Sequence, residues 1–557
     1  MSNYRKSLSG VISETNETPQ TMAIPGRESE MSKNNAGGFS FVVSPWDQLD
    51  RFLILGTEGG TYYTGERELT RDNARNVIRL IQEDGVRVVE RVVEISESGR
   101  APKNDPALFV LALASADDND KTRQAAMTAL PKVARIGTHL FHYAAFVDGL
   151  RGWGRALRRA VADWYLERPI DNLANQVIKY QKRDGWSHRD MLRLAHPVTE
   201  DATRQEIFKW VVGQGKANCD ENVLHPKIIA FEQAKRATSA KEIVSLIHAA
   251  DLPREAIPTE FLKEAKVWEA LLENMPMSAM IRNLATMTRV GLLKPMSSAE
   301  RKVKDSLSNA EVLRKARVHP IQVLAAMLTY KSGRSARGDG VWTPVRSIVD
   351  ALDSAFYGTF GNVTPTGKNT LLALDVSGSM TCGEIAGVPG LSPRVASAAM
   401  ALITANVENS YEFIGFTGGR TGGVWGGTAS SNGVKNVGPV SVLNITPRMR
   451  LDDVIRLVHN LPFAGTDCSL PMLWALEQKL PIESFAVYTD NETYAGQMQP
   501  SQALAKYRKE TGLAAKLAVV GMTATQFTIA DPKDSGMMDV VGFDTAAPQL
   551  MSDFFSK

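Results

Sequence analysis

The sequence predicts a multidomain fold in which an all-α helical-repeat segment is followed by an α/β domain of the doubly wound type. With 557 residues, the chain is too long for a single compact core, so two or more domains are expected. From about Phe39 to Gly361, apolar residues recur at steps of three and four, as in amphipathic helices. After residue 370, short apolar runs alternate with helical patterns, as in a parallel sheet covered by helices.

The first two-thirds of the chain is expected to be a stack of helices joined by short turns. Gly, Pro, Asn and Asp interrupt the helical periodicity at the points where helices begin or end. Successive amphipathic helices bury their apolar faces against one another, as helical-repeat proteins do. The sequence has no fixed repeat period, so this prediction depends on the density of helices. The clearest helical patterns cover residues 70–85, 106–116, 120–136, 151–167 and 277–291.

The last third of the chain is expected to alternate between strands and helices. Four short apolar runs predict buried strands at residues 371–376, 411–416, 485–490 and 515–522. Helical patterns predict helices at residues 392–407, 450–461, 469–480 and 500–512. In a sheet of this type, ligands bind beyond the carboxyl ends of the strands.

The N-terminal residues differ in composition from the rest of the chain. Residues 1–35 are rich in Ser, Asn, Glu and Thr, which predicts a disordered tail. The predicted domains are therefore the tail, a helical domain at 36–362 and an α/β domain at 363–557. No apolar run approaches the roughly 20 residues that span a bilayer, and residues 1–37 contain no apolar signal-peptide core. We therefore expect a cytoplasmic protein without a membrane partner.

Five oxygen-bearing side chains are predicted to meet at one edge of the α/β sheet. Asp375 ends the first strand, and Ser377 and Ser379 lie in the loop after it. Thr466 precedes a predicted helix and Asp490 ends the third strand. Two carboxylates and three hydroxyls suit a hard divalent cation, Mg²⁺ or Mn²⁺, and the neighbouring Asp467 is placed to contribute through a water. The DxSxS motif alone is equally compatible with a capping turn.

The order of these residues resembles a von Willebrand factor A domain. Asp375, Ser377, Ser379, Thr466 and Asp490 match its metal-ion-dependent adhesion site residue by residue. The resemblance implies that the cation, most naturally Mg²⁺, leaves one coordination position for an acidic group of a partner. It therefore favours docking over catalysis.

Positive charge is concentrated in residues 121–200, which contain 14 Lys or Arg and seven Asp or Glu in a chain of net charge +3. Lys179 and Arg183 are predicted to share a helical face that ends at Gly185. A second helix, capped by Ser187 and Asp190, would carry Arg189, Arg193 and His196. Arg151, Arg155 and Arg158 repeat the spacing upstream. Such stripes form a track for the phosphates of RNA, although a solvated helix face would have the same pattern.

Longer motifs in the helical region resemble the TROVE module of the Ro autoantigen family. They include "GWGRALRRAVADWY" (152–165), "KYQKRDGWSHRDMLRLAH" (179–196) and "RVHPIQVLAAMLTYKSG" (317–333). Further matching stretches are residues 51–70, 99–115, 133–141 and 267–288. Together with the A domain, the resemblance covers nearly the whole chain except residues 1–35.

The Ro resemblance implies a ring of HEAT-like helical repeats that is closed by the A domain and binds RNA. Members of the family bind small noncoding Y RNAs on the outside of the ring. They also take the single-stranded 3′ ends of misfolded RNA into a positively charged central hole. Bacterial members are tethered by a Y RNA to the 3′ exonuclease polynucleotide phosphorylase. The family's Y RNA contacts match Lys179, Arg183 and His196, whereas Arg189, Arg193, Arg155 and Arg158 are added from helical spacing.

Three functions remain open from the sequence. The first is a non-catalytic RNA-binding protein of a small ribonucleoprotein. In this case we expect a monomeric ring and no DNA partner. The second is a metal-dependent protein-docking module with the helical part as a spacer. The third is a metal-dependent nuclease, which is disfavoured because two-metal chemistry uses more clustered carboxylates than the two acids of this site.

Overall fold

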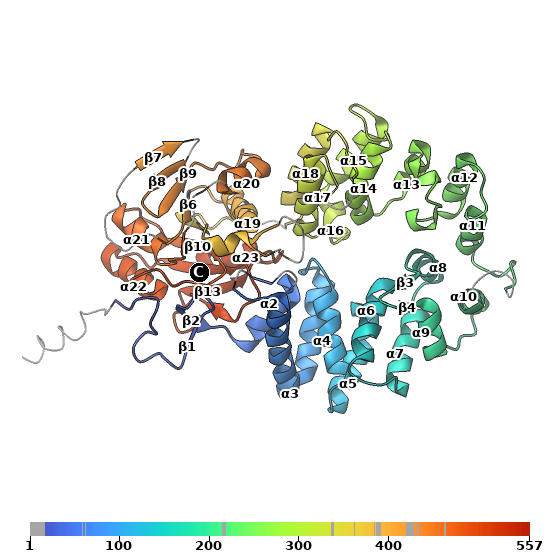
Figure 1. Ribbon diagram of the computed structural model, residues 1–557, viewed down its shortest axis with the longest axis horizontal. Coiled ribbons are helices and arrows are strands. Elements are labelled where there is room, and N and C mark those ends of the chain that lie inside the picture. Colours follow the sequence, from blue (N-terminus) through green and yellow to red (C-terminus); the bar gives the residue numbers. More distant parts are fainter. Residues whose placement is uncertain are drawn as a thin grey trace, which may run out of the picture. The chain divides into compact units, whose positions relative to one another are not determined.

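The chain forms two compact units, which are described separately (Figure 1). The A-domain unit combines Met1–Asn73 with Phe360–Lys557, and the helical unit is Ala74–Thr359. The computed structural model describes residues 17–557 except 58–59, 62, 214–218, 336–338, 361–362, 384, 386–390, 419–427, 432–433, 460 and 462–463.

The helical unit consists almost entirely of α-helices. Helix α3 (Glu66–Ser98) crosses the boundary between the units and contains one non-helical residue, Asp84, whose carboxylate accepts the Arg87 N–H at 3.1 Å. The helices that follow are α4 (Asp105–Ser115), α5 (Asp120–Val133), α6 (Gly137–Asp148), α7 (Arg155–Leu166), α8 (Ile170–Lys179), α9 (His188–Ala195), α10 (Ala202–Gly213), α11 (Pro226–Ala234), α12 (Ala240–Ala250), α13 (Ala265–Glu273), α14 (Met277–Arg289), α15 (Ser298–Leu307), α16 (Ala310–Lys315), α17 (Pro320–Ser332) and α18 (Arg346–Gly358).

Neighbouring helices of this unit pack on one another in succession. Helix α4 packs on α5 and α6, α5 on α7, and α7 on α9. The same arrangement continues from α11 to α12 and α13, and from α17 to α18. The prediction of an all-α stack is therefore confirmed. None of the described helices combines the length and apolarity needed to cross a bilayer.

The A-domain unit is built around an eight-stranded sheet in the order β13-β11-β10-β5-β6-β9-β8-β7. Its strands are β5 (Thr370–Asp375), β6 (Tyr411–Phe416), β7 (Thr428–Ser431), β8 (Val434–Val437), β9 (Val440–Leu443), β10 (Ser484–Thr489), β11 (Lys516–Gly521) and β13 (Met537–Val541). Its helices are α2 (Pro45–Leu55), α19 (Pro393–Val407), α20 (Leu451–His459), α21 (Leu470–Glu477), α22 (Pro500–Thr511) and α23 (Ala547–Ser556). All four predicted strands and all four predicted helices are present.

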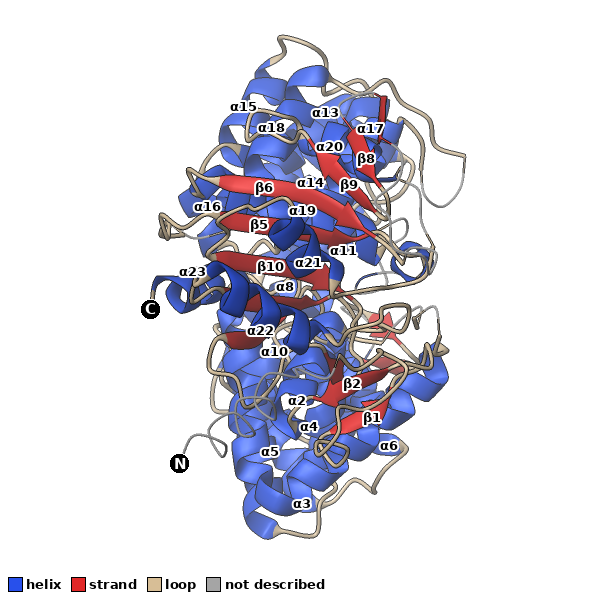
Figure 2. Ribbon diagram, turned by 90° about the vertical axis from the view of Figure 1, so that its left-hand side faces the viewer, coloured by secondary structure: helices blue, strands red, loops and turns tan. Residues whose placement is uncertain are grey.

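The core of this sheet is parallel and lies between helices (Figure 2). Strand β5 is central, pairing with β6 on one side and β10 on the other, and every residue from Thr370 to Asp375 is buried. Helix α19 packs on β5 and β10, whereas α21 packs on β6 and β10. The antiparallel strands β7, β8 and β9 extend the sheet beyond β6, and the sequence analysis did not predict them.

The prediction of a disordered tail at residues 1–35 is wrong for residues 17–35. Strand β1 (Met31–Lys33) pairs with β2 (Phe39–Val42), which pairs with β12 (Phe527–Thr528) of the A-domain unit. The Gln20 side chain is completely buried. The polar composition predicted disorder, but the Gln20 and Asn34 side chains are buried with hydrogen-bond partners, which offsets the cost of their burial. Residues 1–16 lie outside the described residues.

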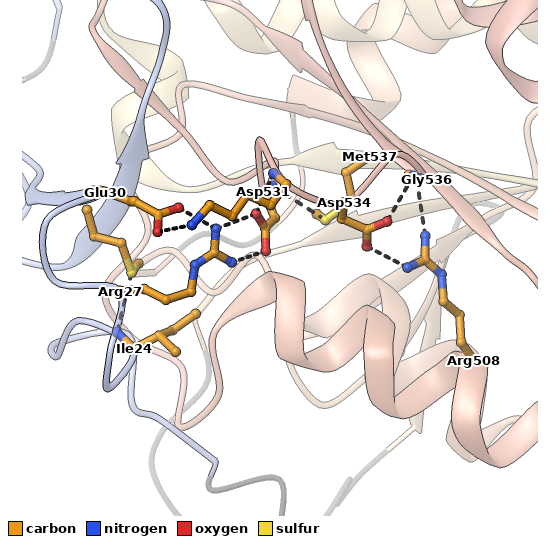
Figure 3. A network of polar contacts seen from close by, with 10 residues as sticks. Ile24, Arg27, Glu30, Arg508, Asp531, Asp534, Gly536 and Met537 are labelled. Carbon is orange, nitrogen blue, oxygen red and sulfur yellow. Dashed lines mark hydrogen bonds and ion pairs between the residues drawn. The ribbon is translucent and has the colours of Figure 1, made fainter.

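Polar contacts attach this N-terminal segment to the loop between β12 and β13 (Figure 3). The Arg27 guanidinium contacts the carboxylates of Asp531 and Glu30, at 2.6 and 2.7 Å from Nη2. Glu30 also accepts a bond from Lys533 Nζ at 2.6 Å. By their contacts, residues 36–73 thus lie in the same compact unit as residues 360–557.

Helix α2 is held on the sheet by a buried arginine. Arg51 is fully buried and donates to the carbonyls of Thr525 and Phe527 at 2.8 Å. Its Nη2 lies 2.6 Å from the Asp539 carboxylate of β13, which also accepts the Thr528 hydroxyl proton at 2.6 Å. Burial raises the pKa of Asp539, and the Arg51 guanidinium opposes that shift. The pair is stable only because both partners are present.

Replacing Arg51 with methionine is expected to destabilise the A-domain unit, because Asp539 then stays buried without its cation. The expected loss is about 3–5 kcal/mol, measured as a shift of the urea unfolding transition followed by circular dichroism. The double variant Arg51→Met/Asp539→Leu is expected to recover much of this loss, since both charges are then gone. A double variant as unstable as the single one would contradict the assignment.

Candidate metal centre and candidate nucleic-acid interface

The carboxyl end of β5 places Asp375 at the sheet edge, where it is completely buried. Its Oδ1 accepts the backbone N–H of Ser377 at 2.9 Å, and its Oδ2 accepts the Thr489 hydroxyl proton at 2.7 Å. The Ser377 and Ser379 hydroxyls lie 3.0 Å apart in the turn that follows. The DVSGS loop therefore folds back on its own carboxylate.

A buried arginine fixes this loop from the adjacent helix. Arg394 in α19 donates to the carbonyls of Val376 and Ser377, the latter at 3.2 Å. Burial raises the pKa of Asp375, and the positive charge of Arg394 partly offsets that shift. Arg394 is not predictable from the sequence, because nothing in the helical pattern of α19 distinguishes a buried arginine from an exposed one.

Asp490 lies beside Asp375 after β10 and is also buried. Its carboxylate accepts the Glu492 N–H at 3.1 Å and a hydrogen bond from Ser379. Burial raises the pKa of Asp490 well above its usual range, and repulsion from Asp375 adds to the shift. Two carboxylates buried this close together both remain ionised only when a positive charge compensates them; otherwise one of them keeps its proton.

Thr466 completes the predicted set. It is fully buried, and its hydroxyl has no hydrogen-bond partner within the described part of the chain. Its loop meets the DVSGS loop where the Gly378 N–H donates to the Ala464 carbonyl at 3.4 Å. A buried hydroxyl without a partner is costly, so this oxygen is suited to an additional ligand.

These observations fit a hard divalent cation. Hydroxyl and carboxylate oxygens from three loops are the donors that Mg²⁺ accepts. The described residues contain no group of three or more His, Cys, Asp and Glu side chains around one point, so a site rich in acids or soft ligands is not formed there. The structure thus brings Asp375, Ser377, Ser379 and Asp490 into mutual contact, with the Thr466 loop adjoining them.

The N-terminal segment holds the loops next to this centre. The Gln20 amide uses all four of its hydrogen-bonding positions: Nε2 donates to Asp467 Oδ1 and the Met498 carbonyl, and Oε1 accepts from Thr493 and Gly496. Asn35 and the Ala36 N–H bind the buried Glu492 carboxylate, whose pKa burial raises to about 7. No sequence motif marked Gln20 or Asn35 for this role.

The region with excess positive charge has a different local structure from the predicted one. Helix α8 ends at Lys179, and residues 182–183 form strand β3, which pairs with β4 (Trp186–Ser187). Asp184 and Gly185 make the connecting turn with φ values of 49° and 83°. Lys179 and Arg183 therefore do not share a helical face. An Asp-Gly pair is a strong signal for a two-residue hairpin turn, and the helical interpretation overlooked it.

The predicted N-terminus of the next helix, α9, is confirmed. Ser187 and Asp190 form a reciprocal capping box at the N-terminus of α9. His196 caps the other end in the left-handed conformation, with a φ of 45°. Arg193 and His196 are exposed, whereas Arg189 is half-buried and lines a hollow of about 270 Å³ with Trp210 and Phe231.

The predicted RNA-binding residues are distributed over several elements. Lys179 is half-buried, and its Nζ lies 5.5 Å from the centre of the Tyr180 ring. Arg183 is 62% exposed on the hairpin, 3.6 Å from Asp184. His196 lines a hollow of about 470 Å³ with Phe208 and Lys209, separate from the hollow that Lys179 lines with Asp251 and Arg254.

Exposed cations nevertheless lie on elements that pack together. Helix α7 packs on α9, and α9 packs on β4. Arg151 precedes α7 and donates to the Ser115 carbonyl, so it belongs to the internal contacts of the unit. We call the remaining exposed cations of α7, the hairpin and α9 the basic surface; they are Arg155, Arg158, Arg159, Lys182, Arg183 and Arg193.

Known proteins resemble the chain along nearly its full length. The family model described as the TROVE domain matches residues 32–251 and 251–368, and the model described as the Ro60 vWA domain matches residues 369–555. "RNA-binding protein RO60" of Deinococcus radiodurans is 43% identical over 541 residues, covering 96% of this chain and 97% of the relative. Its namesake in Caenorhabditis elegans is 35% identical over 602 residues, covering 94% and 89%.

A solved structure agrees with these matches. The crystal structure of the Deinococcus radiodurans RO (RSR) protein aligns with a TM-score of 0.67 at 42% identity, covering 92% of this chain and 99% of that one. Both family models match in the order that the motifs predicted, with TROVE first and the A domain second. This chain is therefore a member of the Ro60 family, with a TROVE domain followed by a Ro60-type von Willebrand factor A domain.

Proposed function

We propose that this protein is a non-catalytic RNA-binding component of a small ribonucleoprotein. The observation that carries the proposal is the basic surface, whose arginines and lysine are exposed on adjoining elements of the TROVE domain. Arg155, Arg158 and Arg193 have no ion pair with any residue that the structure describes, so their charge is available to phosphates. The names of the bacterial and nematode relatives, both RNA-binding proteins, support the same function.

The proposed RNA ligands are of two kinds. A Y-like small noncoding RNA binds through the TROVE domain, with Lys179, Arg183 and His196 as the contacts that the family resemblance implies. The single-stranded 3′ ends of misfolded or structured RNA are the second ligand, taken into the central hole of the family's ring. This activity serves RNA quality control, decay or maturation in the cytoplasm, in association with the 3′ exonuclease polynucleotide phosphorylase through the Y-like RNA.

We further propose that Asp375, Ser377, Ser379, Thr466 and Asp490 hold Mg²⁺. When bound, the cation supplies the positive charge that the two buried carboxylates require and a position for an acidic group of a partner. The residues of the chain orient the ligand oxygens: Thr489 and the Ser377 N–H hold Asp375, and Arg394 holds the loop. This centre favours a second function, metal-dependent docking of a protein on the A domain.

The double variant Arg183→Gln/Arg193→Gln tests the basic surface. Each lost phosphate contact reduces the slope of log K against log salt by about 0.7–0.9, so we expect a slope shallower by roughly 1.5 and a weaker affinity at low salt. The measurement is fluorescence anisotropy with the small RNA that copurifies with the protein, at several salt concentrations.

The matched control for this experiment is Lys241→Gln/Lys266→Gln. These exposed lysines lie on α12 and α13 of the same unit, so the net charge changes equally. The control variant is expected to keep the affinity and slope of the natural sequence. Equal behaviour of the two double variants would contradict the basic surface as the RNA-binding site.

Metal binding is tested with Asp490→Asn. A cation that binds only the folded protein stabilises it by RT ln(1 + [L]/Kd), so Mg²⁺ is expected to raise the melting temperature of the natural protein over that in EDTA. In Asp490→Asn the rise with Mg²⁺ should disappear. Without metal, this variant should melt no lower than the natural protein, because the repulsion with Asp375 is removed.

The control for the metal experiment is Glu483→Gln, which removes a carboxylate just before β10, at the opposite end of that strand from Asp490. It should keep the full response to Mg²⁺. A melting temperature that is the same in Mg²⁺ and EDTA for the natural protein would overturn the metal assignment. Copurification separates the two functions. A protein partner that stays bound after nuclease treatment and is lost in Asp375→Ala supports metal-dependent docking. A bound small RNA supports the RNA-binding function.

A further inference from the structure

We propose that Trp153 and Trp186 form a stacking site for unpaired bases of single-stranded RNA. The inference depends on the proposed RNA-binding function and adds a ligand class and a place to it. The two indole rings come from different elements, the loop before α7 and strand β4, and their centres lie 5.4 Å apart at an interplanar angle of 48°. Both side chains are half-buried, so part of each ring is in contact with solvent.

The backbone next to the two rings in the sequence is open. Three glycines adjoin them: Gly152 and Gly154 flank Trp153, and Gly185 precedes Trp186. A side-chain Cβ at Gly152 or Gly185 would meet no described atom within 4 Å, and one at Gly154 would meet only the Arg151 guanidinium at 3.5 Å. The backbone next to the indoles is therefore not covered by other side chains at these positions, which allows a nucleotide backbone to approach it closely.

The rings are held in place by contacts that leave this open side free. Trp153 Nε1 donates to the Asp148 carboxylate at 3.3 Å, which fixes the ring at its polar edge. Trp186 is fixed by the hairpin, which packs on α6. A ring that is already ordered loses little conformational entropy when a base stacks on it, which favours binding.

Cations for the backbone lie next to the pair. Arg183 is directly opposite Trp186 in the hairpin, and residues paired in this way project from the same face. Arg155 is two residues from Trp153 at the start of α7 and is exposed. Aromatic faces with neighbouring arginines are the combination by which single strands are bound without sequence preference.

Stacking on the two indole rings favours single-stranded RNA over duplex RNA. In a duplex the bases are stacked on one another, and their faces are not accessible to an indole. The remaining cations of the basic surface contact phosphates in either form of RNA. We infer that the basic surface binds structured RNA in general, while the tryptophan pair adds affinity only for an unpaired segment.

The test compares two probes on the full-length protein: a labelled 12-nucleotide oligo(U) and a mixed-sequence RNA duplex of 12 base pairs. The double variant Trp153→Leu/Trp186→Leu is expected to bind oligo(U) about tenfold to a hundredfold more weakly. Its salt slope should be unchanged because no cation is lost, and its affinity for the duplex should be unchanged. Arg183→Gln/Arg193→Gln should instead bind both probes with a shallower dependence of log K on log salt, because two phosphate contacts are lost.

A second readout does not depend on leucine being tolerated. Binding of oligo(U) is expected to quench the tryptophan fluorescence of the natural protein, and less so in Trp186→Phe, which keeps an aromatic ring and most of the affinity. Oligo(U) affinity within twofold of the natural protein in a folded leucine variant would overturn the inference. Equal weakening for oligo(U) and duplex would also overturn it, because the pair would then only support the hairpin.

Two further outcomes separate this inference from its premise. If the natural protein binds neither probe nor its copurifying RNA, the proposed RNA-binding function fails and the stacking site fails with it. If RNA binding is intact in the leucine variant but a nuclease-resistant protein partner is lost, the pair is a protein-docking surface and the stacking site is wrong.

Discussion

Two carboxylates buried side by side at a sheet edge impose the constraint on which the rest of the A domain depends. Asp375 and Asp490 come from strands that are neighbours in the sheet, so their separation is fixed by strand pairing. Their ionised forms are disfavoured by burial and by each other. Hydrogen bonds from the surrounding hydroxyls and N–H groups, together with the charge of Arg394, only partly offset these pKa shifts. The Thr466 hydroxyl oxygen has no hydrogen-bond partner among the described residues. The fold thus places two carboxyl groups where both are ionised only if a cation accompanies them.

The position of the N-terminal segment also depends on polar side chains that need partners in the protein. Gln20, Asn35 and Arg51 are polar side chains whose partners all lie in the last two hundred residues. Gln20 and Arg51 are fully buried, so their hydrogen bonds are made with protein and not with water. Polar specificity of this kind fixes one arrangement of the segment on the sheet, because a shifted arrangement would leave several buried groups without partners.

The main elements were predictable from the sequence because their patterns are periodic and local. The strand at 371–376 and the helix at 392–407 carry continuous or periodic apolar residues, and the motif Asp375–Ser379 follows from its place after a strand. What was not predictable depends on distant partners or on turn chemistry. The burial of Gln20 requires Asp467, which is far away in sequence, and the helical interpretation of 179–185 failed because one Asp-Gly turn overrode the cation spacing.

The division of the A-domain unit into two chain segments has a consequence for synthesis. Residues 1–73 leave the ribosome before all of Ala74–Thr359, and the sheet that receives them is made last. At about 5–20 residues per second, the first segment waits for tens of seconds without its partner strands. During that interval β2 has no β12 to pair with, and Arg51 has no Asp539. Residues 17–35, which are rich in polar side chains, expose little apolar surface during that interval.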